Sequence, residues 1–154
     1  MNDCDYAMAP SGKQNVEFMS LERSRMSRVG QRDTKPEIHV RRALRTLGVG
    51  YRLHVANLPG RPDIVMKGRK KIIEVRGCFW HRHLACPRAS TPKTNKGFWK
   101  DKFARNVARD ARNEAALEAD GWDVLTIWEC ETANTPELIE RVRSFLNLEF
   151  AGLF

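Results

Sequence analysis

Two cysteines and two histidines lie within nine residues of a segment that has neither helical nor strand periodicity. This segment reads Cys78-Phe-Trp-His-Arg-His-Leu-Ala-Cys86, inside an irregular stretch at residues 77–97. A loop of this length needs something other than regular structure to stabilise it. Tetrahedral structural zinc takes four thiolate and imidazole ligands, and the most economical set is Cys78, His83, Cys86 and the distant Cys130. The alternative is a group of unrelated buried thiols that pack as small hydrophobic residues.

The charge balance indicates a polyanionic partner. The 154 residues include 27 Lys and Arg against 19 Asp and Glu, which gives a formal net charge of +8. Nucleic acid is the first candidate for the partner of so basic a chain. No apolar run is long enough to cross a bilayer, and the polar start lacks a secretory signal. We therefore expect a cytoplasmic protein that does not bind membranes and whose cysteines are not paired in disulfides.

Hydrophobic periodicity predicts a mixed α/β domain. The first 16 residues are expected to form a flexible arm, followed by a single domain at 17–154 that begins with a basic helix near 16–29. The elements after this helix have the order α-β-β-β-α-β-α. Their expected positions are 34–48, 51–55, 63–66, 71–75, 98–119, 122–128 and from Thr135 onward. The first three strands suggest a meander.

The long helix at 98–119 has an apolar stripe and a basic face. Its stripe consists of Trp99, Phe103, Val107, Ala111 and Ala115. The helical spacing of these residues predicts that the whole stripe faces the core. The opposite face is rich in Lys and Arg. We expect this face, together with the basic helix near 16–29, to make salt-dependent contacts with the phosphates of a nucleic acid.

Two neighbouring strands carry acidic residues. Asp63 stands at the head of an apolar strand, and Glu74 lies near the end of the next strand, with Arg76 on the same face two residues later. Many nucleases hold Mg²⁺ with carboxylates in this arrangement, because this hard cation prefers oxygen ligands. An Asp that follows a proline is also common as a plain turn residue, so this pattern alone leaves both interpretations open.

Glu37 and the histidines allow structural and catalytic interpretations. Thr34 and Glu37 have the spacing of a capping box at a helix start. His39 and His54 have no partner visible in the sequence and are expected to be ordinary surface or half-buried residues. If His83 ligates zinc, His81 remains free beside the metal and is suited to accept a proton.

Large aromatic residues lie in and beside the irregular loop. Phe79 and Trp80 stand between the predicted zinc ligands, and Trp99 stands near the start of the long helix. Such side chains usually belong to a core. In a basic protein they can instead insert between base pairs.

Taken together, several motifs resemble the very short patch repair (Vsr) endonuclease family, over about residues 20–147. They are Arg32-Asp33-Thr34 with Glu37, Leu58-Pro59-Gly60-Arg61-Pro62-Asp63, Gly77-Cys78-Phe79-Trp80-His81-Arg82-His83, Phe98-Trp99, Asn106, Arg109-Asp110, Gly121-Trp122 and Trp128-Glu129-Cys130. The resemblance implies a restriction-endonuclease-like α/β core with a structural zinc site. It also implies a Mg²⁺-dependent nick in one strand, on the 5′ side of the T in a T:G mismatch left by deaminated 5-methylcytosine.

The resemblance also implies a role for each matching residue. Asp63 would be the main Mg²⁺ ligand, His81 the general base and Glu37 its acidic helper. The Val75 backbone carbonyl would be a second Mg²⁺ ligand, where the family has Thr-His and this chain has Val75-Arg76. Glu74 resembles the second acid of the wider nuclease superfamily, and Arg76 can only stabilise charge.

The remaining implied roles concern zinc and DNA. Zinc would be held by Cys78, His83, Cys86 and Cys130, although the gap from His83 to Cys86 is one residue longer than the family suggests. The residues expected to insert into the DNA stack are Met26, Phe79, Trp80 and Trp99.

The resemblance further implies a bacterial enzyme that acts as a monomer on double-stranded DNA and has MutL-type proteins as partners. Two alternatives remain at this point. One is a restriction-type or nicking endonuclease without mismatch specificity. The other is a zinc-containing DNA-binding module without turnover.

Overall fold

The computed structural model describes residues 32–149. Residues from Lys35 onward form one compact unit of the chain. The predictions for the flexible arm at 1–16, the basic helix near 16–29 and the inserted residue Met26 lie outside the described residues. Among the helices that are described, none has the length and apolar character to span a membrane.

The order of the helices and strands in this unit is the predicted α-β-β-β-α-β-α. Its helices and strands are α2 (Lys35–Thr46), β1 (Arg52–Leu53), β2 (Ile64–Met66), β3 (Lys71–Arg76), α3 (Lys96–Ala119), β4 (Asp123–Trp128) and α4 (Thr135–Phe145). A 3₁₀ turn, η1 (Lys67–Arg69), joins β2 to β3, and η2 (Glu129–Thr132) follows β4. The first strand is shorter than expected, with only two residues in the ladder.

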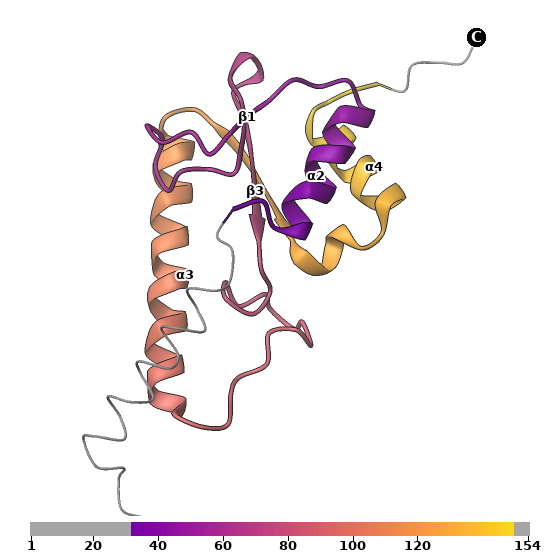
Figure 1. Ribbon diagram of the computed structural model, residues 1–154. Helices are drawn as coiled ribbons and strands as arrows, with labels where there is room; N and C mark the ends of the chain where they lie inside the picture. The colour runs from indigo at the N-terminus through magenta and orange to yellow at the C-terminus, as the bar shows by residue number, and fades with distance from the viewer. Residues whose placement is uncertain (1–31, 150–154) are drawn as a thin grey trace, which may run out of the picture. The chain divides into compact units, whose positions relative to one another are not determined.

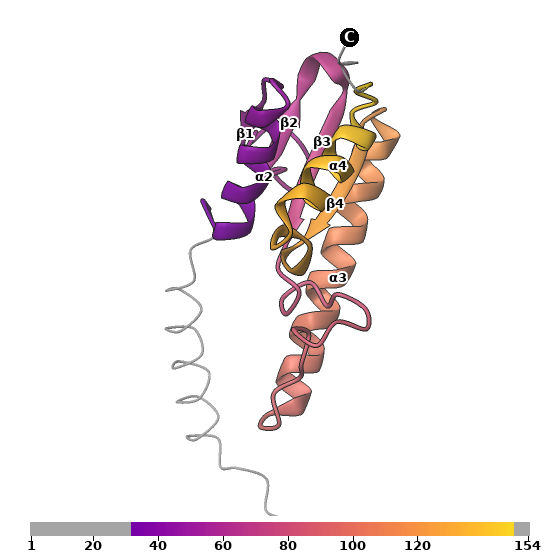
Figure 2. The ribbon, with the colours of Figure 1, turned by 90° about the vertical axis from the view of Figure 1, so that its right-hand side faces the viewer.

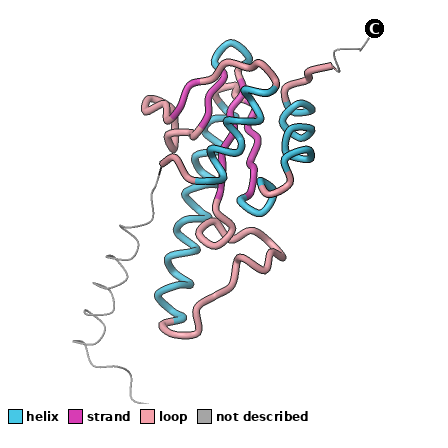
Figure 3. The backbone as a smooth tube through the Cα atoms, turned by 45° about the vertical axis from the view of Figure 1, so that its right-hand side comes forward, coloured by secondary structure: helices cyan, strands magenta, loops and turns pink. Residues whose placement is uncertain are grey.

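The four strands form one mixed sheet in the order β1-β2-β3-β4. The predicted meander is confirmed, because β1 pairs antiparallel with β2, and β2 pairs antiparallel with β3. Strand β4 then pairs in parallel with β3, from Lys71 opposite Asp123 to Arg76 opposite Trp128. A parallel neighbour requires a crossover connection, which the loop after β3 and helix α3 supply (Figure 3).

Helices cover both faces of the sheet. On one face α2 and α4 pack side by side (Figures 1 and 2), and α3 lies on the other. The first face holds the larger core, made by Val40, Ala43, Leu44, Ile64, Met66, Ile73, Ile127, Leu138, Val142 and Leu146. The second face holds a smaller cluster, made by Val65, Ile72, Leu117 and Trp122. The alternation of side chains along β2 and β3 distributes them between these two cores.

Helix α3 does not present its predicted apolar stripe to the core. Trp99 and Phe103 are buried as expected, but Val107 is 45% exposed and Ala111 and Ala115 are exposed. The side chains that reach from the middle of α3 to the rest of the protein are polar instead, because they bind the ends of β3 and the following loop. The prediction was wrong for this half of the helix, and the reason is that this half lines the candidate site.

Candidate functional site

Asp63 is positioned by a tight turn that precedes β2. Gly60 in this turn has φ +73°, and a Cβ there would lie 2.7 Å from the Asn113 amide nitrogen. Only glycine adopts this backbone conformation without strain. The turn directs the Asp63 side chain toward β3, where Asp63 Oδ2 accepts a hydrogen bond from the Val75 backbone N–H at 2.8 Å. The carboxylate is therefore held at the edge between β2 and β3.

Burial raises the pKa of Asp63 from 3.8 to about 6. The hydrogen bond from Val75 opposes this shift, the negative charges of Glu37 and Glu74 add to it, and His81 partly offsets it. A carboxylate in such surroundings is poorly stabilised as an anion, so a bound cation would stabilise it strongly. Within a strand, the N–H and C=O of one residue face the same neighbour. The Val75 carbonyl thus faces the same side as its N–H, toward Asp63.

Glu37 and His54 flank Asp63 from α2 and from the end of β1. Glu37 is buried in the first turn of α2 and binds Arg41 at 3.0 Å. His54 Nε2 lies 3.8 Å from Glu37 Oε2, and His54 Nδ1 lies 4.0 Å from Asp63 Oδ1. His54 is half-buried, as predicted, but its ring stands between two acidic groups of the candidate site, which the sequence did not indicate.

His81 is bound to the middle of α3. Its Nδ1 lies 2.5 Å from Asp110 Oδ2, and its backbone N–H donates to the Gly77 carbonyl at 3.1 Å. Partial burial raises the pKa of Asp110, but the hydrogen bond and charge of His81, with Arg76 and Arg109, outweigh this effect and leave its pKa below the usual value. Asp110 is thus an ionised partner that fixes the imidazole through Nδ1, a contact that does not involve Nε2.

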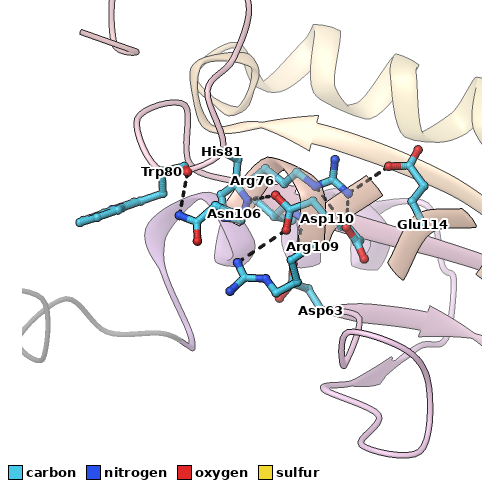
Figure 4. A network of polar contacts seen from close by, with 10 residues as sticks. Asp63, Arg76, Trp80, His81, Asn106, Arg109, Asp110 and Glu114 are labelled. Carbon is cyan, nitrogen blue, oxygen red and sulfur yellow. Dashed lines mark hydrogen bonds and ion pairs between the residues drawn. The ribbon is translucent and has the colours of Figure 1, made fainter. Parts of the chain in front are cut away.

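Three polar side chains of α3 follow one another at intervals of four residues and bind three separate partners (Figure 4). Asn106 donates to the Trp80 carbonyl at 3.1 Å, Asp110 binds His81, and Glu114 Oε2 accepts from Arg76 at 3.0 Å. Residues four apart lie on one face of a helix. We call Asn106, Asp110 and Glu114 the α3 ladder.

The predicted zinc ligands lie together. The ligand atoms of Cys78, His83, Cys86 and Cys130 are all within 4.8 Å of one another. His83 Nδ1 lies 3.6 Å from Cys78 Sγ and 3.3 Å from Cys130 Sγ. A zinc tetrahedron with ordinary bond lengths has S–N edges of about 3.6 Å, so the residues fit this ion. The His83 ring also stacks on Trp128 at 4.3 Å, which fixes its orientation.

The aromatic residues of the loop and of α3 form one cluster. Phe79 makes edge contacts with Trp80, Trp99 and Phe103 at centroid distances of 4.9, 5.6 and 5.2 Å. Trp99 is only 5% exposed, whereas Phe79 and Trp80 are half-buried. Phe79 and Trp80 are thus partly accessible at the surface of this cluster, whereas Trp99 is enclosed within it.

The structure therefore brings Asp63, Val75, Glu37 and His81 into one region, with the four-residue zinc group beside it. Glu74 lies in the same region, but its carboxylate is occupied by Arg76 at 2.6 Å. Sequence reasoning quoted Asp110 within a matching motif but assigned no role to it, and it missed His54 as a member of the site. The available signal for Asp110 was its spacing of four from Asn106, which places two polar residues on one helix face.

Comparisons with known proteins indicate the family of the chain. The family model described as DNA mismatch endonuclease Vsr matches residues 18–87. The type II nicking enzyme V.XorIIP of Xanthomonas oryzae pv. oryzae is 43% identical over 131 residues, covering 84% of this chain and 96% of the relative. The type II nicking enzyme V.NmeAIP of Neisseria meningitidis is 38% identical, covering 76% and 83%. The DNA mismatch endonuclease Vsr of Escherichia coli is 37% identical, covering 75% and 73%.

A solved structure supports the fold. The catalytic domain of the homing endonuclease I-Bth0305I superposes with a TM-score of 0.52 at 23% identity, and the match covers 73% of this chain and 94% of that one. This likeness supports the mixed α/β fold that the element order predicts. The sequence relatives span most of the chain and show the family to which it belongs. This protein belongs to the Vsr family of DNA endonucleases.

Proposed function

We propose that this endonuclease nicks one strand of DNA on the 5′ side of the T in a T:G mismatch, in a Mg²⁺-dependent reaction. The observation that carries the proposal is that Asp63 and His81 are both fixed at the end of β3. Asp63 accepts from the Val75 N–H at 2.8 Å, and His81 is bound to the Gly77 carbonyl and to Asp110. A cation-binding carboxylate and an oriented base are the two groups that phosphodiester hydrolysis needs. The mismatch specificity rests on the likeness to the Escherichia coli relative.

Mg²⁺ would be held by the Asp63 carboxylate and the Val75 carbonyl. When bound, this cation supplies charge stabilisation for the phosphate and for the leaving oxygen. Glu37 lies close to Asp63 and contacts Arg41 and His54. The negative charge of Glu37 favours a cation at the site. Glu74 adds negative potential but already accepts two hydrogen bonds from Arg76.

His81 is the proposed general base. Nδ1 is occupied by Asp110, so Nε2 is the nitrogen that takes a proton from the attacking water. The water oxygen bonds to phosphorus while the bond to the leaving oxygen breaks, and the leaving oxygen takes a proton from solvent. Asp110 stabilises the imidazolium that forms, because its carboxylate is ionised.

Zinc would hold the loop that carries His81. The four ligands come from the loop and from Cys130 in η2 after β4, so a bound ion would fasten the loop to the end of the sheet. Structural zinc contributes to folding directly. This role differs from that of Mg²⁺, since all four zinc positions are filled by protein side chains.

Two features support DNA as the substrate and a mismatch as the point of attack. The outer face of α3 carries exposed basic residues such as Lys100, Arg105 and Arg112, which suit phosphate contacts. Phe79 and Trp80 are accessible for insertion beside a mispaired step, where unstacking costs less than in paired DNA. Insertion of Trp99 as well would require the aromatic cluster to open.

A second candidate is nicking without mismatch specificity. It is favoured by the names of the Xanthomonas and Neisseria relatives, which are called type II nicking enzymes. The two candidates share the same catalytic groups and differ only in the DNA that is cut.

A strand-resolved nicking assay separates these candidates. It compares a duplex with one T:G pair in a cytosine-methylation context with its C:G twin, each with and without Mg²⁺. We expect a single break 5′ to the T, only in the mismatched duplex and only with Mg²⁺. Equal cutting of both duplexes would favour the second candidate, and no cutting of either would contradict both.

A further inference from the structure

Arg76 is largely buried and is bound by two acidic side chains. It ends β3 on the face toward α3, and its side chain is 12% exposed. Its Nε and Nη2 donate to Glu74 Oε2 at 3.2 and 2.6 Å, and Nη2 also donates to Glu114 Oε2 at 3.0 Å. A guanidinium has a fixed planar fork of donors, so these bonds determine where the helix carrying Glu114 lies relative to the strand.

Glu114 is the last member of the α3 ladder and the one bound to the sheet. Asn106 and Asp110 bind the loop residues Trp80 and His81. That loop has no regular structure of its own at this point, so its position depends on what it is bound to. Asp110 lies one helical turn from Glu114, and Arg76 is near enough to lower the pKa of Asp110. The Arg76–Glu114 bond thus connects β3 directly to the part of α3 that binds His81.

A direct contact between Arg76 and the DNA phosphate fits this geometry poorly. Arg76 would have to leave Glu74, which is 14% exposed, and Glu114, which is 34% exposed. Two partly buried carboxylates would then lose their partner, which is costly. Glu74 also lies near Asp63 and already raises its pKa.

We propose that Arg76 is a positioning residue that, through Glu74 and Glu114, fixes α3 on β3 so that Asp110 holds His81 in its working orientation. This inference rests on the proposed catalytic role of His81 but not on mismatch specificity. It assigns Glu74 to the support of Arg76. It also assigns to Glu114 a function that its place on a largely exposed helix does not suggest.

The test compares Arg76→Gln, Glu114→Ala and the double variant with the matched control Glu118→Ala, which removes an exposed glutamate one turn further along α3. The measurements are the single-turnover nicking rate on the T:G duplex with Mg²⁺, and the affinity for that duplex without Mg²⁺ at several salt concentrations. We expect each single variant to lose roughly 10- to 100-fold in rate at unchanged affinity. The double variant should lose little more, because both changes break one connection.

A phosphate-binding Arg76 would give a different result. Arg76→Gln would then weaken DNA binding and reduce the slope of log affinity against log salt by about one. Glu114→Ala would leave Arg76 freer to bind DNA and would keep or raise the rate. Either result, or wild-type rates in both variants, would overturn the inference.

A measurement that does not depend on catalysis tests the positioning role of Arg76 and Glu114 separately. Amide hydrogen exchange at His81 should become faster in Glu114→Ala but not in Glu118→Ala, since the loop loses its support. Unchanged exchange would count against the inference. If the wild-type protein nicks neither duplex, the proposed function fails while exchange still tests the positioning. Should Arg76→Gln fail to fold, Arg76→Lys, which keeps the charge but not the fork, should fold and still show a reduced rate.

Discussion

His81 Nδ1 lies 2.5 Å from Asp110 Oδ2, which joins an irregular loop to a long helix across 29 positions of the chain. The loop carries the imidazole, and the helix carries the carboxylate that binds it. Neither element alone contains this pair. The pair exists only when α3 crosses from β3 to β4 on the face of the sheet that carries Asp63.

Replacement of Asp110 by Asn is expected to remove most of the activity. The amide can contact His81 Nδ1 but can also donate to it, which stabilises the wrong tautomer and no longer compensates an imidazolium. We expect the single-turnover rate to fall on the order of 100-fold or more, with DNA affinity and melting temperature near wild type. Asp120→Asn, an exposed position past the end of α3, is the charge-matched control. A rate within a few-fold of wild type would show that Asp110 does not orient the base.

Much of the fold could be predicted from the sequence. Strand β2 at Ile64–Met66 is a continuous apolar run, and such a run indicates a strand covered on both faces. Pro36 in the first turn of α2 and Pro136 in the first turn of α4 fit those helix starts. The parallel pairing of β4 with β3 was not predicted, because register between distant segments has no local signal.

The candidate site, like the fold, could be predicted only in part from the sequence. The zinc group was predicted because cysteine and histidine spacing is a local pattern with few alternatives. The inner face of α3 was mistaken because Val107 and Ala111 continue an apolar period that the structure leaves exposed. Polar residues face inward there because they bind the loop. A periodicity argument assumes an apolar partner and cannot anticipate this.

Replacement of Asp63 by Asn is expected to stabilise the Mg²⁺-free protein at neutral pH. The pKa of Asp63 is raised from 3.8 to about 6 by burial. The folded state therefore favours the neutral carboxyl, whose stabilising effect is full below pH 4 and is lost as the pH rises through 6. A shift of two pKa units corresponds to about 3 kcal/mol in the free energy of unfolding. Asparagine does not ionise, so the variant is not destabilised in this way at neutral pH.

Urea denaturation at pH 4 and pH 7.5, without added Mg²⁺, checks this expectation. The free energy of unfolding of Asp63→Asn should exceed that of wild type by up to about 3 kcal/mol at pH 7.5 and by little at pH 4. Added Mg²⁺ should stabilise only the wild type, because the variant lacks the anionic ligand. A stability difference that does not change with pH would contradict the raised pKa.

Replacement of Cys130 by Ser is expected to lower stability and activity together. Cys130 Sγ lies 3.3 Å from His83 Nδ1 across 47 positions, so loss of this thiol removes the ligand that connects the loop to the end of β4. Structural zinc contributes to folding outright. Elemental analysis should find one zinc per chain in the wild type and less than one in Cys130→Ser.

The matched control is Cys4→Ser, since Cys4 stands apart from the predicted ligands in the sequence. It should keep the zinc content, the melting temperature and the nicking rate of the wild type. A Cys130→Ser protein with full thermal stability would speak against a structural ion at this group. Equal zinc loss in both variants would show that the metal binds thiols without selectivity.

Replacement of Trp80 by Ala is expected to weaken recognition of the mismatch more than binding to paired DNA. Trp80 is half-buried at the surface of the aromatic cluster, 4.9 Å from Phe79 and beside Lys102. Loss of one base–aromatic stack costs about 1–3 kcal/mol, whereas phosphate contacts from α3 remain. The dissociation constant should therefore rise for the T:G duplex and change little for the C:G duplex. Leu53→Ala, which removes another partly exposed apolar side chain on β1, should affect neither. An equal loss of affinity for both duplexes would indicate that Trp80 supports the fold of the loop and does not sense the mispair.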